Sequence, residues 1–418
     1  MYLKFIQFRI GPWVFLEYHK GMSKTLNEKL TEMEACKFHN HDLTVLKQWD
    51  KEDFVPFDGQ HAIHVAGTNG KGSVITWLEV LFKAQACQTR SFISPHLIRH
   101  NERFRINGQA ITMQEWETIY DAFCDRFFAR RMTMFEMDLW MARQAFIHHQ
   151  TSDPTWTMIE TGLGGSQDAT TALDYKYGII TQIGFDHMAF LGSTKAEIAQ
   201  AKAGIIQPGM LVVTFEKDPD CLAVFQQRAR SVHAKLKILN DSDLAQVDFS
   251  EFWDLHLPAY QKENFMCAYT LLNEIGYSFS CDQLKQAIQD FFWPARFQVL
   301  RQDPYLVLDG AHNPDGIEAL VSSLMQSHTK IDQIYFSVLA DKQAHVMIRR
   351  LQDLTNNLHF VSFESERLAD LDQLAQEYNA PVVELDTLFQ ELATTSKTTL
   401  ACGSLYFAGY VLEHFLKL

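Results

Sequence analysis

The sequence predicts an α/β protein with two domains, each built on a mostly parallel sheet. Strand-like apolar runs alternate with segments whose apolar residues recur every three or four positions, which is typical of parallel strands joined by crossover helices. The chain has 418 residues, more than one compact core usually holds. This alternation restarts after Trp293-Pro294. We therefore expect a larger domain over residues 1–296 and a smaller one over residues 297–418.

In the larger domain, short apolar runs alternate with amphipathic stretches. The predicted strands are Ala62–Ala66, Thr157–Glu160, Gly178–Ile183 and Leu211–Phe215. The predicted helices include Ser73–Ala86 and Met113–Phe128.

In the smaller domain the same alternation continues to the end of the sequence. The predicted strands are Tyr305–Asp309, Gln333–Leu339, His359–Phe363, Val382–Leu385 and Thr398–Cys402. The predicted helices are Asp315–Met325 and Leu405–Leu416. A cleft between two such domains is the expected place for a ligand.

Composition narrows the class of protein. Hydrophobic residues make up 47% of the chain and the formal net charge is −14, so we expect a globular protein that contacts neither nucleic acid nor an anionic membrane over a broad surface. The 7 cysteines form no C-x-x-C pair, which argues against a disulfide framework or a zinc site and favours the cytoplasm. No apolar run approaches the roughly 18 to 20 residues of a membrane span.

The first 21 residues are apolar but interrupted by Lys4, Gln7 and Arg9. They lack a cleavage site of small residues, so we interpret them as neither a signal peptide nor an anchor. Met22 is a plausible alternative start, which would make these residues an upstream extension.

The most informative segment, His61–Val74, has the sequence H-A-I-H-V-A-G-T-N-G-K-G-S-V. A strand that runs into a glycine-rich turn with Lys and Ser is typical of a P-loop, in which backbone N–H groups, an ammonium and a hydroxyl surround phosphates and magnesium. ATP is the expected ligand, although the turn is shorter than an ordinary P-loop, and a plain strand-to-helix turn is the alternative. The residues expected at the phosphates are Gly67, Thr68, Asn69, Gly70, Lys71, Gly72 and Ser73.

A second glycine-rich segment, M-I-E-T-G-L-G-G-S-Q-D-A-T-T, places Glu160 at the end of a predicted buried strand. A carboxylate at the carboxyl end of a strand beside a phosphate loop can bind magnesium. A capping or turn carboxylate is the alternative.

Two further segments carry weaker signals. The sequence I-T-Q-I-G-F-D-H ends in His187, a possible metal ligand or phosphate contact that Asp186 could orient, or else a structural histidine. Lys202 lies in A-K-A-G-I-I, on a helix where a lysine is usually a solvated surface residue.

In the smaller domain, V-L-D-G-A-H-N-P-D-G places Asp309, His312 and Asn313 between a strand and a helix. Such loops present ligand-binding groups in α/β domains. Turn and helix N-cap chemistry explains the same residues equally well.

Together these segments resemble the folylpolyglutamate synthase and dihydrofolate synthase family of the Mur ligase superfamily. The resemblance implies a P-loop nucleotide-binding N-terminal domain and a Rossmann-like α/β C-terminal domain. It rests on the segments above together with S-P-H-L-I-R-H-N-E-R, L-G-S-T, P-A-R-F, A-D-K and G-S-L-Y, which with them span residues 61–406.

The resemblance also implies roles for individual residues. Lys71 would hold the ATP phosphates, and Ser73 and Glu160 would bind the first of two Mg²⁺ ions. The second Mg²⁺ would lie near Glu160, His187 and Lys202, where the matching lysine is carbamylated in relatives.

Other matching positions lie further along the chain. Asn264, Arg296 and Asp309 match ATP-contacting positions, with Arg296 near the phosphates and Asp309 near the ribose. The incoming glutamate would be bound by His312 and Ser404, and the pterin side by S-P-H-L and the region around Phe135-Glu136. The departures from the family pattern are Ser166-Gln167 in place of Arg-Leu, Ala201 in place of an acidic residue and Ala295 in place of a glycine.

The expected activity is therefore the ATP-dependent ligation of L-glutamate to a folate or dihydropteroate carboxylate through an acyl phosphate, by a monomer. Lys71, Lys202, Asp309 and His312 are the expected catalytic residues. The alternatives are a Mur-type ligase for a UDP-linked peptide, which generally has an extra N-terminal domain, and a nucleotide-sensing module without turnover.

Overall fold

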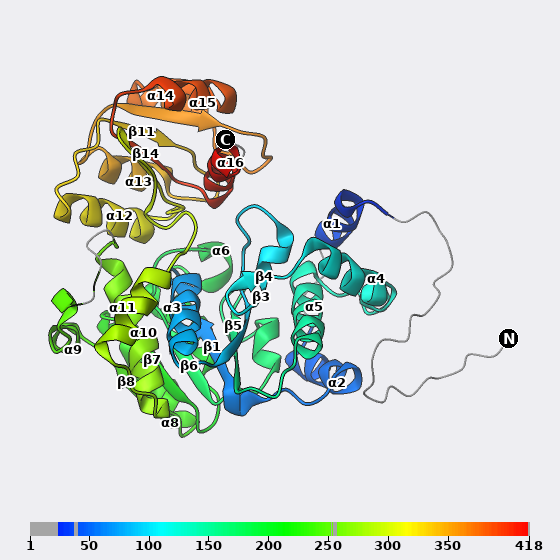
Figure 1. Ribbon diagram of the computed structural model, residues 1–418. Helices are drawn as coiled ribbons and strands as arrows, with labels where there is room; N and C mark the ends of the chain where they lie inside the picture. The colour runs from blue at the N-terminus through cyan, green and yellow to red at the C-terminus, as the bar shows by residue number, and fades with distance from the viewer. Residues whose placement is uncertain (1–23, 37–40, 252, 254–256, 417–418) are drawn as a thin grey trace.

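The computed structural model describes residues 24–36, 41–251, 253 and 257–416, which form two α/β domains stacked one on the other (Figure 1). The predicted fold class is confirmed. The expectation for residues 1–21 and for Met22 lies outside the described residues. No helix within these ranges is long and apolar enough to cross a membrane.

The larger domain contains an 8-stranded sheet in the order β4-β3-β2-β5-β1-β6-β7-β8. Neighbouring strands are parallel except around β3, which pairs antiparallel with β2 and β4. The strands are β1 (Ala62–Ala66), β2 (Gln88–Phe92), β3 (Phe104–Ile106), β4 (Gln109–Ala110), β5 (Thr155–Glu160), β6 (Tyr177–Ile180), β7 (Leu211–Thr214) and β8 (Lys235–Ile238).

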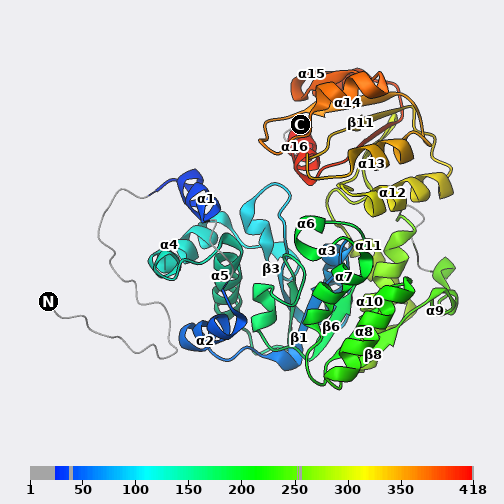
Figure 2. The same cartoon turned by 180° about the vertical axis from the view of Figure 1, so that it is seen from behind.

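Helices cover both faces of this sheet, as the opposite views in Figures 1 and 2 show. Two buried apolar clusters, one on each face, form the core. One face carries α3 (Lys71–Ala84), α10 (Tyr260–Ile275) and α11 (Cys281–Asp290). The other carries α1 (Leu26–Ala35), α2 (Leu43–Asp53), α4 (Met113–Ala129), α5 (Met134–His148), α7 (Lys195–Lys202) and α8 (Pro219–Ser231), and the short α6 (Met188–Leu191) and α9 (Asp241–Ala245) complete the domain.

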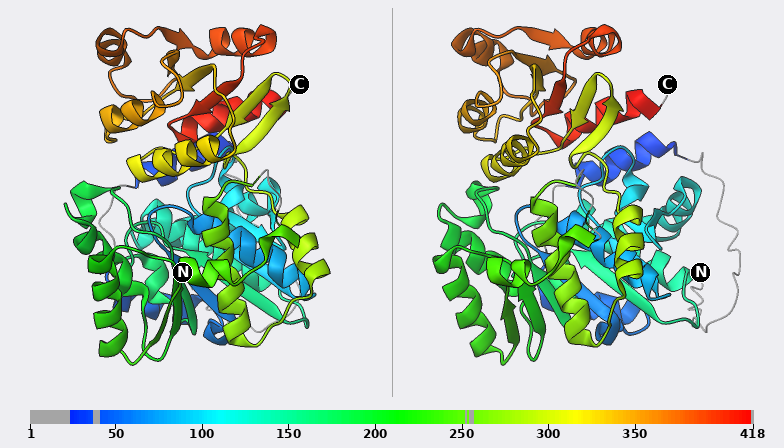
Figure 3. Two further views of the ribbon diagram at one scale, coloured as in Figure 1. Left: turned by 90° about the vertical axis from the view of Figure 1, so that its left-hand side faces the viewer. Right: turned by 60° about the vertical axis from the view of Figure 1, so that its left-hand side comes forward.

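The smaller domain contains a 6-stranded sheet in the order β13-β12-β11-β14-β10-β9, parallel except for β9 at its edge. Its strands are β9 (Gln298–Gln302), β10 (Tyr305–Leu308), β11 (Gln333–Phe336), β12 (Leu358–Ser362), β13 (Val382–Glu384) and β14 (Thr399–Cys402). One face packs against α12 (Pro314–Gln326), α13 (Ala344–Leu351) and α14 (Leu371–Tyr378), and the other against α15 (Leu385–Thr394) and α16 (Leu405–Leu416). Figure 3 shows this domain above the larger sheet in both views.

Each predicted strand and helix is present, with ends shifted by a few residues. The strand predicted to reach Ile183 stops at Ile180, and beyond it the Ile183 N–H donates to the Glu216 side chain rather than to a neighbouring strand. The prediction missed β2, β3, β4, β8 and β9.

Candidate active site

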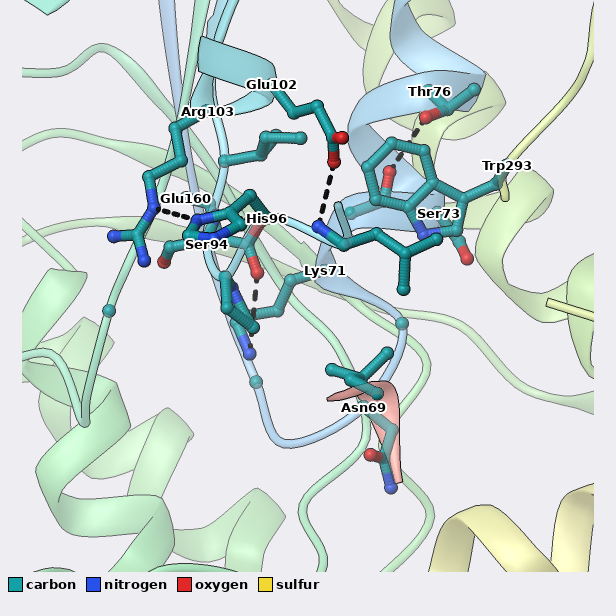
Figure 4. Close-up of a pocket in the computed structure, with 18 of the residues that line it drawn as sticks. Asn69, Lys71, Ser73, Thr76, Ser94, His96, Glu102, Arg103, Glu160 and Trp293 are labelled. Atoms are coloured by element: carbon teal, nitrogen blue, oxygen red, sulfur yellow. Dashed lines mark hydrogen bonds and ion pairs between the residues drawn. The ribbon is translucent and has the colours of Figure 1, made fainter. Parts of the chain in front are cut away.

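A cleft of about 1600 Å³ runs between the two domains. Its floor is the carboxyl end of the large sheet, where the loops after β1, β5 and β6 emerge side by side because these strands are parallel neighbours. Ligands of open α/β sheets bind at this edge. Figure 4 shows Lys71, Ser73 and Glu160 together at this floor.

The loop from Gly67 to Ser73 joins β1 to α3 through two backbone conformations that favour glycine. Gly67 has φ +144 and Gly70 has φ +88, and a Cβ on Gly67 would lie 1.7 Å from the Thr181 hydroxyl oxygen. The loop therefore turns sharply into the N-terminus of the 14-residue α3, whose unpaired N–H groups face the cleft. This geometry suits an anion such as a phosphate.

Gly72, which separates Lys71 from Ser73, has a packing role. A Cβ at this position would lie 2.5 Å from Trp293 Cζ2, so the loop can approach the indole only because no side chain intervenes. Trp293 in turn lies under the Arg105 guanidinium, 5.1 Å from the ring centroid. Sequence reasoning missed Trp293, whose contact with the loop is distant in sequence.

Lys71, Ser73 and Glu160 line the cleft together. Lys71 Nζ lies 3.6 Å from Glu160 Oε1 and donates to the Thr68 carbonyl at 3.3 Å. Glu160 is 4% exposed and its other oxygen accepts from the Ser94 N–H at 3.2 Å. Burial raises the Glu160 pKa, so this carboxylate gains from a nearby cation.

Lys202 is buried at the end of α7 rather than solvated. It is 5% exposed, and its Nζ donates to the Gly67 carbonyl at 2.7 Å. Burial, helped by the positive charge of Lys71, lowers the Lys202 pKa to about 7. A substantial fraction of this amine is therefore neutral near neutral pH, the form that can act as a nucleophile.

His187 lines the cleft, and Asp186 Oδ1 accepts from its backbone N–H at 2.8 Å but forms no hydrogen bond with its ring. The His187 ring nitrogen Nε2 lies 4.0 Å from Asp186 Oδ1, too far for a hydrogen bond. His187 has φ 51, a left-handed backbone conformation at the start of α6. Asp186 instead accepts from Lys342 Nζ at 2.5 Å and from Asn313 Nδ2 at 3.2 Å.

Asp186 therefore ties the two domains together, a role that sequence reasoning missed. Three of the groups around its carboxylate, from Lys342, Asn313 and His312, belong to the smaller domain, with His312 Nε2 at 3.5 Å. These positive and donor groups hold the Asp186 pKa far below its usual range despite the cost of burial. The ion pair with Lys342 is almost fully buried at the cleft.

The remaining predicted residues divide into two groups. Arg296, His312 and Ser404 line the cleft from the smaller domain side. Asn264 lies behind the loop, where its amide oxygen packs against Gly70. Asp309 is 3% exposed and accepts from the N–H groups of residues 297 and 311, both at 2.7 Å, which fixes the loops that carry Arg296 and His312.

Of the two residues Phe135 and Glu136 expected at the pterin side, one lines the cleft and the other does not. Phe135 lines the cleft and packs against Gly162. Glu136 is 1% exposed, caps the N-terminus of α5 and forms a hydrogen bond with His41.

Among the departures from the family pattern, Ala295 adopts φ 52, a backbone conformation that favours glycine. Phe297, two residues further along the same connection between the domains, also has a positive φ of 53.

The residues at the floor fit a hard cation such as Mg²⁺. Ser73 and Glu160 offer oxygen ligands, which Mg²⁺ prefers. Within the described ranges no three His, Cys, Asp or Glu side chains gather as a metal-binding group. A bound Mg²⁺ would therefore take further ligands from phosphate and water, as is usual for this ion.

No protein-family model matches the chain. It is 30% identical over 380 residues to dihydrofolate synthase/folylpolyglutamate synthase of Bacillus subtilis, covering 83% of this chain and 88% of that protein. It is 27% identical over 372 residues to the Escherichia coli protein of the same name, covering 84% and 85%.

Solved structures of proteins with this name also superpose on the chain. A bifunctional folylpolyglutamate synthase/dihydrofolate synthase from Yersinia pestis, complexed with AMPPNP and Mn, superposes with a TM-score of 0.82 at 25% identity, covering 96% of this chain and 100% of that one. A structure of a bifunctional synthase of the same name with Mn, AMPPNP and L-glutamate bound gives 0.80 at 26% identity, covering 95% and 99%.

Proposed function

The chain belongs to the folylpolyglutamate synthase and dihydrofolate synthase family, and we propose that it ligates L-glutamate to a folate carboxylate at the expense of ATP. The observation that carries the proposal is the cleft itself. Lys71, Ser73 and Glu160 on one side face Arg296 and His312 on the other. This combination suits a phosphoryl transfer followed by attack of an amine.

In the first step the acceptor carboxylate attacks the γ-phosphate and forms an acyl phosphate, because a free carboxylate is a poor electrophile. Lys71 and the N-terminus of α3 hold the phosphates and offset the charge on the group in transfer. Arg296, at the connection between the two domains, lines the cleft and adds a second positive charge. Removing the Lys71 ammonium should nearly abolish ADP release.

Magnesium, when bound, neutralises phosphate charge and orients the transferred group. Ser73 and Glu160 would hold one ion. Glu160, His187 and Lys202 would hold the second, with Lys202 carbamylated. The lowered Lys202 pKa supports this assignment, because the neutral amine is the form that reacts with carbon dioxide, and the carbamate supplies oxygen ligands.

In the second step the glutamate amino group attacks the acyl phosphate and releases phosphate. We assign His312 and Ser404 to this glutamate. The domain contacts at Asp186 keep His312 at the cleft, so closure both assembles the site and excludes water that would hydrolyse the acyl phosphate. Asp309 contributes indirectly, because it fixes the loop that carries His312. Asn264 also contributes indirectly, because it supports Gly70 in the phosphate loop.

The protein is further proposed to act as a cytoplasmic monomer without a nucleic-acid partner. The net charge of −14 supports the last point. The decisive experiment offers Mg-ATP and glutamate with tetrahydrofolate or dihydropteroate in parallel and measures the mass of the acceptor. Addition of one glutamate to either acceptor supports the proposal, and extension of a UDP-linked peptide instead would replace it.

A further inference from the structure

A buried carboxylate on α3 has no role in the proposed chemistry. Glu79 is 4% exposed and lies on the same face of α3 as Gly72, because the seven residues between these positions make about two turns of an α-helix. Its Oε1 accepts from the Ser91 hydroxyl at 2.5 Å, and its Oε2 lies 3.0 Å from Arg105 NH2. Ser91 and Arg105 lie opposite each other in the β2–β3 pair. Two neighbouring strands therefore bring a hydroxyl and a cation to this one carboxylate.

The Arg105 side chain is held firmly in place. It is 12% exposed, and its NH2 also donates to the Gly108 carbonyl at 2.7 Å. The two N–H groups of this nitrogen can serve both acceptors, one from each side. Burial raises the Glu79 pKa, while the positive charge of Arg105 and the Ser91 hydroxyl oppose that rise. Arg105 is therefore a fixed cation with its own counter-ion.

The Arg105 guanidinium also contacts the connection between the domains. It lies over the indole of Trp293, 5.1 Å from the ring centroid, and a Cβ on Gly72 would come within 2.5 Å of Cζ2 of this ring. Figure 4 shows the indole beside Ser73, in the first turn of α3. The contacts thus form a closed circuit, which runs from Glu79 through Arg105 and Trp293 back to the start of the same helix.

Trp293 joins two parts of the candidate site. One part is the phosphate loop, which the indole touches at Gly72. The other is Arg296, which lines the cleft and follows Trp293 by three residues in the connection between the domains. A shift of the indole would therefore displace both the loop that is to hold the phosphates and the guanidinium that is to approach them.

We propose that Arg105 is a positioning residue, which clamps Trp293 against Gly72 and so fixes the phosphate loop and Arg296 in the geometry that phosphoryl transfer needs. The inference rests on the proposed function. A planar guanidinium suits this role, because it can stack on an aromatic face while its N–H groups bond to a carboxylate. A lysine in its place would keep the ion pair with Glu79 but lose the planar contact with the indole.

The test is therefore Arg105→Lys, with Arg90→Lys as the matched control. Arg90 lies on the neighbouring strand β2, but it donates to the carbonyl of His149, the C-cap of α5 on the opposite face of the sheet, at 3.4 Å. Calorimetry measures the binding of a non-hydrolysable ATP analogue, and steady-state kinetics gives kcat and the KM values for ATP, acceptor and glutamate. Urea unfolding shows that each variant is folded.

We expect Arg105→Lys to weaken binding of the ATP analogue and to lower kcat, each roughly three- to thirtyfold, the range that a buried cation–π contact contributes. The KM values for acceptor and glutamate should stay within about twofold of wild type, as for groups distant from the change. Arg90→Lys should behave as wild type. In a Trp293→Leu background, Arg105→Lys should cause no further loss, because the ring through which Arg105 acts is gone.

Unchanged analogue affinity and kcat in Arg105→Lys, or an equal loss in Arg90→Lys, would overturn the inference. An undiminished loss in the Trp293→Leu background would also overturn it, because a role confined to the ion pair with Glu79 does not depend on the indole. Each of these results leaves the proposed function intact if the wild-type protein shows acceptor-dependent ADP release. Absence of that release in the wild type would instead reject the proposed function.

Discussion

Asn69 in the phosphate loop and Asn313 at the N-terminus of α12 form a reciprocal pair of amide hydrogen bonds across the two domains. Each Nδ2 donates to the other Oδ1, at 2.9 and 3.0 Å. Asn313 Oδ1 also caps α12 through the Gly316 N–H at 2.8 Å, and Asn313 Nδ2 donates to Asp186. The phosphate loop therefore contacts the smaller domain directly.

The first prediction concerns this pair. Asn69→Ala and Asn313→Ser should each lower kcat/KM for ATP roughly five- to thirtyfold, because the domains lose a contact that assembles the site. Serine keeps the α12 N-cap, so the helix is preserved. The double variant should be no worse than the poorer single variant, and fully additive losses would show that the two amides act independently.

The second prediction concerns Gly72. Gly72→Ala should lower the free energy of unfolding by about 1 to 3 kcal/mol, because the methyl group overlaps the Trp293 ring. Urea unfolding measures this change. Adding Trp293→Leu should restore part of the loss.

Gly70→Ala is the control for this contact. Gly70 has φ +88 and an added Cβ would lie 2.6 Å from Asn264 Oδ1, so its penalty comes from the backbone and from Asn264, and Trp293→Leu should not relieve it. Equal rescue of both alanine variants would contradict the packing role of Gly72.

The third prediction concerns pH. The Lys202 pKa is about 7 in the folded protein and 10.5 in its ordinary state, so between these values the unfolded chain binds more protons. Lys202 therefore makes the unfolding free energy rise with pH in this window, by at most about 1.4 kcal/mol per pH unit. Lys202→Met should remove this rise.

Urea unfolding at pH 7, 8 and 9 measures the effect. Lys195→Met, on the same helix but at a partly exposed lysine, is the matched control and should keep the wild-type slope. Identical slopes for wild type and Lys202→Met would show that Lys202 is charged in the folded protein.

The fourth prediction concerns the metal. Glu160→Gln should raise the Mg²⁺ concentration needed for half-maximal ADP release at least about tenfold, because an amide is a weaker ligand for a hard cation. Glu102→Gln is the control, since Glu102 also lines the cleft but accepts from the N–H groups of residues 97–99. The same Mg²⁺ requirement in both variants would contradict the assignment of Glu160.

The sequence predicted the buried parallel strands well because continuous apolar runs bounded by turns are distinctive. It missed β2, Q-T-R-S-F, although β2 is internal, because its polar residues have partners elsewhere in the fold. Ser91, for example, donates to the buried Glu79 at 2.5 Å. It also missed the edge strands β8 (K-L-K-I) and β9 (Q-V-L-R-Q), because they are short and polar residues interrupt their apolar runs.

The same limit applies to the site. The glycine-rich loop and Glu160 were found because each depends on neighbours in sequence. The role of Asp186 depends on Lys342, 156 residues away, and only the packed domains bring them together. Lys202 was expected to be solvated from its residue type alone, and its burial follows from the packing of α7 against the phosphate loop.

The measurement that tests the central claim most directly follows oxygen through the reaction. The acceptor carboxylate is labelled with ¹⁸O, and the phosphate released in the presence of Mg-ATP and glutamate is analysed by mass spectrometry. Formation of an acyl phosphate in this cleft predicts that one labelled oxygen passes from the acceptor to each phosphate released. Unlabelled phosphate, released together with a glutamate-extended acceptor, would contradict the account.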